Sequence, residues 1–169
     1  MRYTLGIIAI LFLGGALLFY VLGGFAPVDI ENKQLSELKL MGYEYKGTPQ
    51  NEKLNEIFRT IEAHKNLHPE AHLYTIYEVE PAGKSDTLVV FVGLDVEIPD
   101  RPGLQSREFP EGPAIVASIQ AHRFVMPSPA KVKQYIQEFA EENRLPSPSV
   151  FVDKIISHRE IQVIAYSTP

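Results

Sequence analysis

The stretch NEKLNEIFRTIEAHKNL, residues 51–67, has a counterpart further along the chain, PAKVKQYIQEFAEENRL, residues 129–145. The two stretches align without a gap at an offset of 78 residues (129 − 51). In both, apolar residues recur at the i, i+3, i+4, i+7 spacing of one helical face. These residues are Leu54, Ile57, Phe58 and Ile61 in the first copy and Val132, Tyr135, Ile136 and Phe139 in the second. The pattern predicts two amphipathic helices that are copies of one another.

Strand-like runs surround each of these predicted helices. One run precedes each helix, and two runs that are joined by a short turn follow it. The runs lie at residues 38–47, 72–80 and 87–97 in the first copy and at 114–124, 149–156 and 160–168 in the second. We therefore predict an α+β fold of tandem βαββ repeats with pseudo-twofold symmetry. The first repeat is assigned to residues 38–98, a Pro- and Gly-rich linker to 99–112, and the second repeat to 113–169.

The duplication, together with HLYTIYEVEP at residues 72–81 and VVFVGLDVE at residues 89–97, resembles the GyrI-like family of small-molecule (effector) binding domains. The resemblance covers nearly all of the chain after the N-terminal apolar segment. It implies that the repeats meet about a pseudo-twofold axis and that a ligand lies in the groove between them. It also implies that an acidic residue on the middle strand of the second repeat, in an E-x-Y setting, meets cationic ligands. The expected ligand is a hydrophobic or cationic organic molecule, and the expected role is that of a sensor, a carrier or a sequestering protein.

The repeat offset indicates which residues of the middle strands belong to this groove. It aligns Asp153 with Thr75 and Ile155 with Tyr77. Asp153 then stands where the resemblance implies a glutamate, and Ile155 where it implies a tyrosine. The carboxylate is kept on a shorter side chain, but one aromatic face for a flat cation is lost. Tyr77 in the first repeat is expected to supply an aromatic surface to the groove.

Alternation along the first strand of each repeat separates two faces. The more apolar face, which carries Met41 and Ile119, is expected to meet the helices. The opposite face, which carries Glu44, is expected to look toward the groove, and Gly42 on that face leaves room for a ligand or for a close neighbouring strand. The same face of the second repeat supplies two further polar residues. The predicted ligand-binding set is Glu44, Tyr77, Gln120, His122, Asp153 and Ile155.

Residues 1–27 are predicted to form a transmembrane signal anchor with its N-terminal flank. Residues 5–22 contain no charged side chain, and about 20 apolar residues in a helix cross a ~30 Å hydrocarbon core. Arg2 before the span and Asp29 after it favour a cytoplasmic N-terminus and a periplasmic or otherwise extracytoplasmic domain. A secretory signal cleaved near residues 23–26 is the alternative. Residues 28–37 are then a juxtamembrane linker, and the lipid bilayer is an expected partner of this single-pass membrane protein.

Composition argues against several classes of function. The chain has 16 Lys and Arg against 21 Asp and Glu and no cysteine. No basic stripe is present, so a nucleic-acid partner is not expected. His64, His68 and His72 are four residues apart, but Pro69 interrupts the helix that would bring them together, so no metal is predicted. Glycine-rich phosphate loops and GxSxG are absent from the domain, and no cofactor is expected.

Two other functions remain open from the sequence. The groove or a sheet edge could receive a protein partner at the membrane instead of a small molecule. A weak hydrolase of reactive small molecules would need His122 to approach Glu44 or Asp153 for general acid–base chemistry. No catalytic residue is assigned, and a groove that has lost its ligand is a further alternative, because the family glutamate and tyrosine are replaced.

Overall fold

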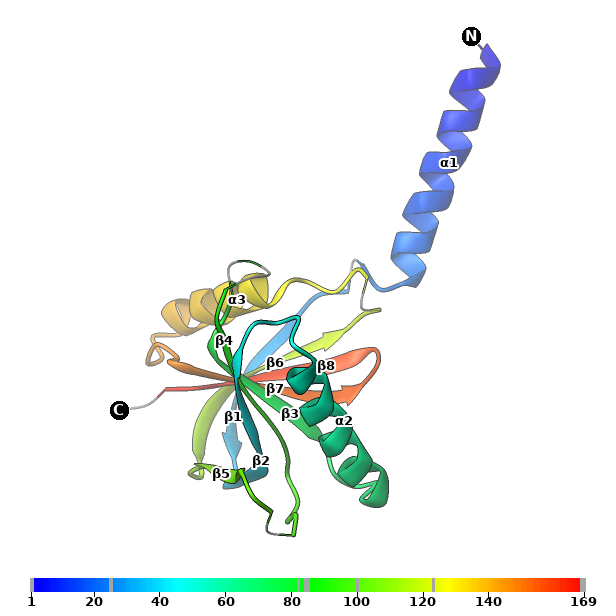
Figure 1. The fold of residues 1–169 in the computed structure, drawn as a ribbon. Coiled ribbons are helices and arrows are strands. Elements are labelled where there is room, and N and C mark those ends of the chain that lie inside the picture. The colour runs from blue at the N-terminus through cyan, green and yellow to red at the C-terminus, as the bar shows by residue number, and fades with distance from the viewer. Residues whose placement is uncertain are drawn as a thin grey trace.

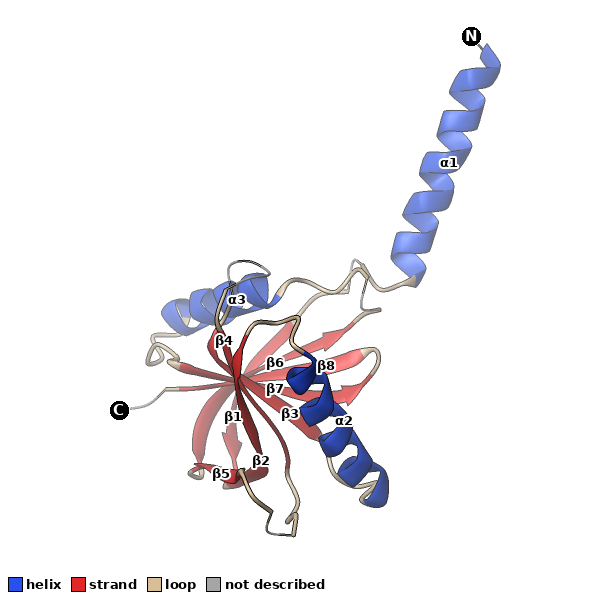
Figure 2. Cartoon of the chain, in the orientation of Figure 1, coloured by secondary structure: helices blue, strands red, loops and turns tan. Residues whose placement is uncertain are grey.

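The computed structural model describes residues 2–167 except 25, 82, 84, 85, 100 and 123, and it describes side chains from residue 12 onward. This part of the chain contains three helices and eight strands (Figures 1 and 2). In chain order they are α1 (Arg2–Val21), β1 (Asp29–Leu35), β2 (Leu38–Gly47), α2 (Glu52–Leu67), β3 (Leu73–Val79), β4 (Leu88–Leu94), β5 (Leu104–Phe109), β6 (Gly112–Gln120), α3 (Pro129–Glu142), β7 (Val150–Ser157) and β8 (Glu160–Tyr166). The α+β class and the two strand–helix–strand–strand units predicted from the sequence are confirmed.

All eight strands belong to one antiparallel sheet in the order β1-β6-β8-β7-β3-β4-β2-β5. The two repeats meet at its centre, where β3 pairs with β7 and Thr75 lies directly opposite Asp153. These two residues are also equivalent under the repeat offset (153 − 75 = 78). A residue that pairs with its own repeat equivalent lies on the symmetry axis, so the pseudo-twofold axis of the domain passes through the Thr75–Asp153 pair.

Both amphipathic helices form where the spacing predicts them and pack on the same face of the sheet. Asn51 caps α2 by accepting a hydrogen bond from the backbone N–H of Lys53 at 2.9 Å, and Ser128 caps α3. The buried side chains of α2 join a first helix-side cluster, whose members include Leu54, Ile61, Leu73, Val90 and Val92. Those of α3 join a second helix-side cluster, whose members include Ala117, Val132, Ile136, Ala140 and Val163. Met41 packs against the first cluster and Ile119 belongs to the second, so the predicted helix-facing side of the first strands is confirmed.

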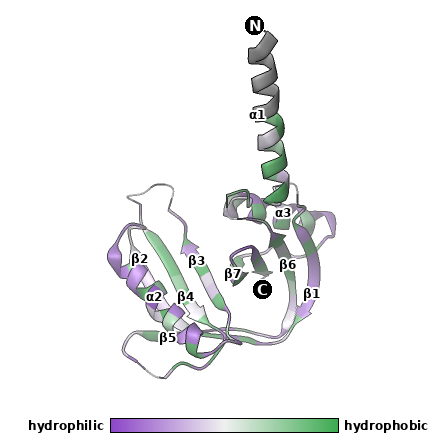
Figure 3. Ribbon diagram, turned by 90° about the vertical axis from the view of Figure 1, so that its right-hand side faces the viewer, coloured by the Kyte–Doolittle hydropathy of each residue, from purple (hydrophilic) through white to green (hydrophobic). Residues whose placement is uncertain are grey.

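The other face of the sheet is buried as well. An opposite-face cluster draws side chains from both repeats, among them Leu40, Tyr74, Phe91, Val116, Val152, Ile164 and Tyr166. Phe109 of β5 stacks on Tyr166 of β8, with ring centroids 4.7 Å apart, although these strands are far apart in the sheet order. The sheet is therefore strongly bent, and Figure 3 shows the β2–β4–β5 side and the β1–β6 side as two arms.

Two segments that the sequence analysis assigned to linkers contain edge strands. β1 lies within residues 28–37 and pairs with β6, and β5 lies within residues 99–112 and pairs with β2. Their sequences, DIENKQL and LQSREF, are largely polar, and their side chains are exposed or partly exposed. Charged side chains of this kind are typical of edge strands, because they discourage pairing with another sheet. Hydrogen bonds to an inner strand hold these segments in place, together with a few apolar side chains, Ile30 and Leu35 of β1 and Leu104 and Phe109 of β5, that pack against the clusters.

The N-terminal helix α1 rises away from the sheet (Figure 1). Its described apolar side chains are exposed, with Phe12 at 77% and Leu17 at 64%. Among the residues whose side chains are described, no helix is long and apolar enough to cross a membrane. The first part of the predicted anchor, residues 1–11, lies outside those residues, and membrane anchoring stays a prediction. The chain leaving α1 is attached to the domain by a 2.8 Å hydrogen bond from the backbone N–H of His122 to the carbonyl of Leu22.

Candidate functional site

The central strands β3 and β7 present a row of side chains on the helix face, between the areas that α2 and α3 cover. Alternation and register place Thr75, Tyr77, Phe151, Asp153 and Ile155 on this face. Ile155 packs against the cluster under α2, and Phe151 packs against the cluster under α3. Thr75 and Asp153 lie between these contacts, at the junction of the two repeats. We call this region the central groove.

Asp153 is a partly buried carboxylate at the centre of the groove. Its pKa is raised from 3.8 to about 6: burial is the largest cause, the positive charge of Lys133 lowers the pKa, and the negative charge of Glu80 raises it. Its cross-strand neighbour Thr75 is only 4% exposed. Within the described part of the chain, neither a hydrogen bond nor an ion pair holds the Asp153 carboxylate. A desolvated carboxylate without a partner is costly to the fold, and such groups are common at functional sites.

Lys133 of α3 reaches across the groove to the end of β3. Its ammonium group forms an ion pair with the Glu80 carboxylate and lies 4.9 Å from the centroid of the Phe151 ring. The Lys133 side chain is 25% exposed, so the pair is partly shielded from water. An ammonium group at this distance from an aromatic face makes a cation–π contact. The central groove therefore already contains one positively charged group, the ammonium group of Lys133.

Tyr77 adds an aromatic side chain on the first-repeat side of the groove. Tyr77 is a large, mostly apolar residue, and yet it is 37% exposed. Burial, followed by the negative charges of Asp153 and Glu80, raises the pKa of Tyr77. Its hydroxyl therefore stays protonated at neutral pH and can donate a hydrogen bond.

The cavity beside Asp153 is small. It measures about 70 Å³ and is lined by Asp153, Lys133, Val132, Ile119, Ile161, Val163, Pro127 and Pro129. Drug-sized ligands occupy cavities of roughly 300–1,000 Å³. A ligand larger than a few atoms could enter only if the Lys133 side chain moved away from Glu80.

The other three residues of the predicted set lie elsewhere. Glu44 is on the opposite face of the sheet, where it accepts a 2.6 Å hydrogen bond from Arg107, which also contacts Glu78 at 3.2 Å. Gln120 and His122 lie at the base of α1, where they line a separate cavity of about 300 Å³ together with Leu22 and Arg159. The central groove thus brings together Tyr77, Asp153 and Ile155 and excludes Glu44, Gln120 and His122.

The arrangement needed for a hydrolase built on His122 does not form. Glu44 is bound to Arg107 on the face of the sheet opposite the helices. Asp153 is paired with Val163, which is paired with Ala117 of β6. His122, in contrast, lies beyond the end of β6. In the described structure neither carboxylate is within hydrogen-bonding distance of the His122 ring, so this ring has no carboxylate partner for acid–base chemistry.

Three residues of the groove were missed by the sequence analysis. They are Lys133, which follows the buried Val132 on α3, Glu80, which is the first residue after β3, and Phe151, which is two residues before Asp153. Phe151 shares the alternation that identified Asp153, so the same reasoning could have included it. The Lys133–Glu80 contact joins residues 53 apart in the chain, and no sequence pattern indicates it.

No family model matches the sequence, and no curated protein matches it either. Several solved structures share its fold. An integron cassette protein from Vibrio cholerae is 12% identical, with a TM-score of 0.53, and the match covers 82% of this chain and 95% of that one. The C-terminal domain of EcmrR is 11% identical, with a TM-score of 0.55, over 83% of this chain and 96% of the domain. A hydrolase from Listeria innocua is 10% identical, with a TM-score of 0.58, over 83% and 92%. At these identities the likeness shows the fold alone, and it confirms, for the fold, the resemblance to GyrI-like effector-binding domains.

Proposed function

We propose that this domain binds a small organic cation with an apolar body in the central groove. Asp153 would supply the counter-charge, while Tyr77 and Phe151 would supply aromatic surfaces. The observation that carries the proposal is the desolvated Asp153 carboxylate, which has no hydrogen-bond partner in the described structure and lies on the pseudo-twofold axis.

The position of Lys133 supports a cation as the ligand. Its ammonium group lies close to the Phe151 ring and its charge acts on Asp153, so the groove already stabilises a positive charge at this place. Lys133 is bound to Glu80 and not to Asp153. The Asp153 carboxylate is therefore available to an incoming cation once the Lys133 side chain leaves Glu80 and turns toward solvent.

The test is a calorimetric titration of the full chain with benzyltrimethylammonium, with benzyl alcohol as the neutral control. We expect binding of the cation at pH 7.5 and roughly tenfold weaker binding at pH 5, because Asp153 is then mostly protonated. Asp153→Asn should weaken binding about tenfold or more, because it removes the counter-charge. Glu62→Gln, which removes a carboxylate from the exposed face of α2, should leave the affinity unchanged.

A second variant is expected to act in the opposite direction. Lys133→Gln removes a competing positive charge and widens the groove, so the affinity for benzyltrimethylammonium should increase about tenfold. Lys131→Gln makes the same charge change on the same helix at an exposed position and serves as the control. Equal affinities for the cation and for benzyl alcohol would exclude the proposed role of Asp153.

We also propose that α1 tethers the domain to a membrane, with the domain on the extracytoplasmic side. The support is the run of apolar residues from 5 to 22 and the exposure of its described side chains. After alkaline carbonate extraction of cells that express the full chain, we expect the protein in the membrane pellet. A Leu13→Lys/Leu17→Lys variant should move to the supernatant. Release of the wild-type chain by carbonate would rule out an integral anchor.

A further inference from the structure

A second cavity lies on the opposite face of the sheet from the central groove. It has a volume of about 240 Å³ and is covered by the connection from β1 to β2, residues 35–38. The apolar part of its wall is aliphatic and consists of Leu35, Leu38, Val116 and Ile164. Its polar wall consists of Tyr74, Lys154, Gln162 and Tyr166, with Lys33, Ser36 and Glu37 on the side of the β1–β2 connection. We call it the opposite-face cavity.

The hydroxyl group of Tyr166 is the unexplained polar atom in this cavity. Tyr166 is 8% exposed, and within the described part of the chain its hydroxyl has no hydrogen-bond partner. The stacked Phe109 ring fixes the orientation of the Tyr166 ring. Burial raises the pKa of Tyr166, so the group remains an O–H donor at neutral pH. A buried donor without an acceptor destabilises the fold, and a ligand acceptor that reached this hydroxyl would remove that cost.

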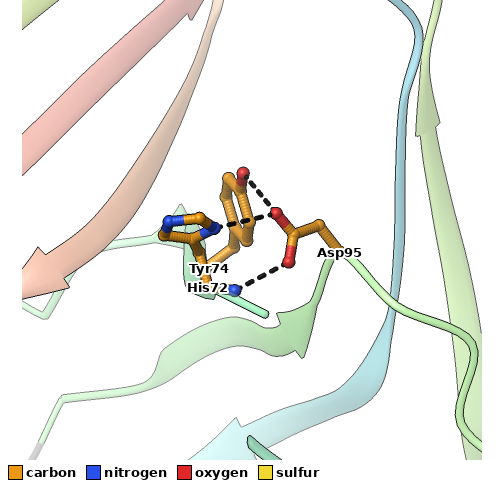
Figure 4. A network of polar contacts seen from close by, with 3 residues as sticks. All are labelled: His72, Tyr74 and Asp95. Carbon is orange, nitrogen blue, oxygen red and sulfur yellow. Dashed lines mark hydrogen bonds and ion pairs between the residues drawn. The ribbon is translucent and has the colours of Figure 1, made fainter. Parts of the chain in front are cut away.

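Tyr74 on the neighbouring wall is already satisfied. Its hydroxyl donates a 3.1 Å hydrogen bond to the Asp95 carboxylate, which also accepts a 2.7 Å bond from the backbone N–H of His72 and lies 3.2 Å from the His72 ring (Figure 4). Asp95 therefore holds Tyr74 in place. Tyr166 lines the same cavity as Tyr74 and belongs to the same opposite-face cluster.

Lys154 supplies a positive charge beside these two tyrosines. It is directly opposite Tyr74 in the β3–β7 pairing, and its ammonium nitrogen lies 5.8 Å from the centroid of the Tyr74 ring. In the described structure Lys154 forms no ion pair, whereas Lys33 at the rim is paired with Glu31. The remaining carboxylate of the lining, Glu37, is exposed in the β1–β2 connection. Lys154 is therefore the cationic side chain of this lining without an ion-pair partner in the described part of the chain.

We propose that the opposite-face cavity is a second ligand site, which binds a small monocarboxylate with an apolar body. The carboxylate would accept hydrogen bonds from the Tyr166 hydroxyl and the Lys154 ammonium group, and the apolar body would lie against Leu35, Leu38 and Ile164. The size of the cavity selects a ligand smaller than the drug-sized molecules that fill roughly 300–1,000 Å³. The site is independent of the central groove, because it lies on the other face of the sheet and takes a ligand of the opposite charge.

The test is a calorimetric titration of the full chain with sodium benzoate, with benzamide and acetate as controls. Benzamide has the shape of benzoate without its charge, and acetate has the charge without the ring. We expect benzoate to bind, and each control to bind at least tenfold more weakly. If benzamide or acetate binds as tightly as benzoate, the assignment to an apolar monocarboxylate is wrong.

Two substitutions locate the site. Lys154→Gln should weaken benzoate binding about tenfold or more, because it removes a charge-assisted hydrogen bond. Tyr166→Phe should weaken it about fivefold and should also raise the melting temperature of the ligand-free protein by a few degrees, because a buried unpaired hydroxyl is removed. A purely structural role of Tyr166 would instead lower the melting temperature.

Lys46→Gln at an exposed position of β2 and Tyr135→Phe on α3 make the same chemical changes away from this cavity. Both should bind benzoate like the wild type. Benzoate affinity that survives both Lys154→Gln and Tyr166→Phe would overturn the site. Loss of benzyltrimethylammonium binding alone would refute the proposed function and leave this inference standing.

Discussion

Replacing Asp153 with asparagine is expected to increase the free energy of unfolding at pH 8 by roughly 2–3 kcal/mol. The basis is the pKa of Asp153, which burial raises from 3.8 to about 6 in the folded domain. Each unit of pKa shift corresponds to about 1.4 kcal/mol. Asparagine has nearly the same shape and carries no charge, so the cost of burying the ionised carboxylate disappears. For a domain of this size the melting temperature should rise by about 5 °C.

The direction of the pKa shift determines how the stability of the folded domain depends on pH. Because the folded-state pKa is above the unfolded-state value, the folded domain binds more protons between pH 4 and 6, and its stability falls as the pH rises through this window. Below about pH 3 both states are mostly protonated, so Asp153→Asn and the wild type should differ little. Above pH 6 nearly the full difference should be present. Urea denaturation from about pH 3 to pH 8, with Glu62→Gln as the exposed control, measures it. A difference that does not change with pH would contradict the assigned pKa.

Gly42→Ala is expected to destabilise the domain by about 3 kcal/mol or more. A Cβ atom at this position would lie 2.1 Å from the carbonyl oxygen of Val92 and 2.5 Å from the Cα of Gly93. Both are backbone atoms of β4, so β2 and β4 would have to separate at the paired glycines Gly42 and Gly93. The absence of a side chain at Gly42 thus allows the neighbouring strand β4 to approach closely and does not make room for a ligand.

Gly112→Ala is the matched control for this substitution. It is also a glycine in a strand of the sheet, but a Cβ atom there would have no neighbour within 4 Å. We expect its stability to change by less than about 1 kcal/mol. Urea midpoints of the two variants compare them directly, and similar midpoints would mean that β2 and β4 can move apart at little cost.

The repeat could be predicted from the sequence because the helix periodicity and the strand-like runs recur at a constant offset. That offset also identified Asp153 and Tyr77, since repeat-equivalent residues of the two middle strands meet at the axis. β1 and β5 were not recognised because edge strands with charged side chains carry no apolar alternation. Their position depends on hydrogen bonds to β6 and β2, which are contacts distant in the chain.

The structure places Glu44 and Gln120 away from Asp153 for a different reason. Alternation separates the two faces of a strand, but it does not show which face is open. Here the bending of the sheet buries most of the face opposite the helices and leaves the opposite-face cavity there, while the central groove lies on the helix face between α2 and α3. The Lys133–Glu80 pair also needs the three-dimensional arrangement, because it joins a helix of the second repeat to a strand end of the first.

The axis through Thr75 and Asp153 has a consequence for charge at the centre of the domain. A symmetric dimer of one repeat would place two identical side chains there, with Cβ atoms about 5 Å apart. Two carboxylates at such a distance cannot both ionise easily and would share a proton. Because both repeats belong to one chain, the two halves of this pair can differ: one is a hydroxyl and the other an acid. The duplicated domain can therefore keep a single negative charge on its own symmetry axis, and a cation bound there would have only one orientation that satisfies both halves.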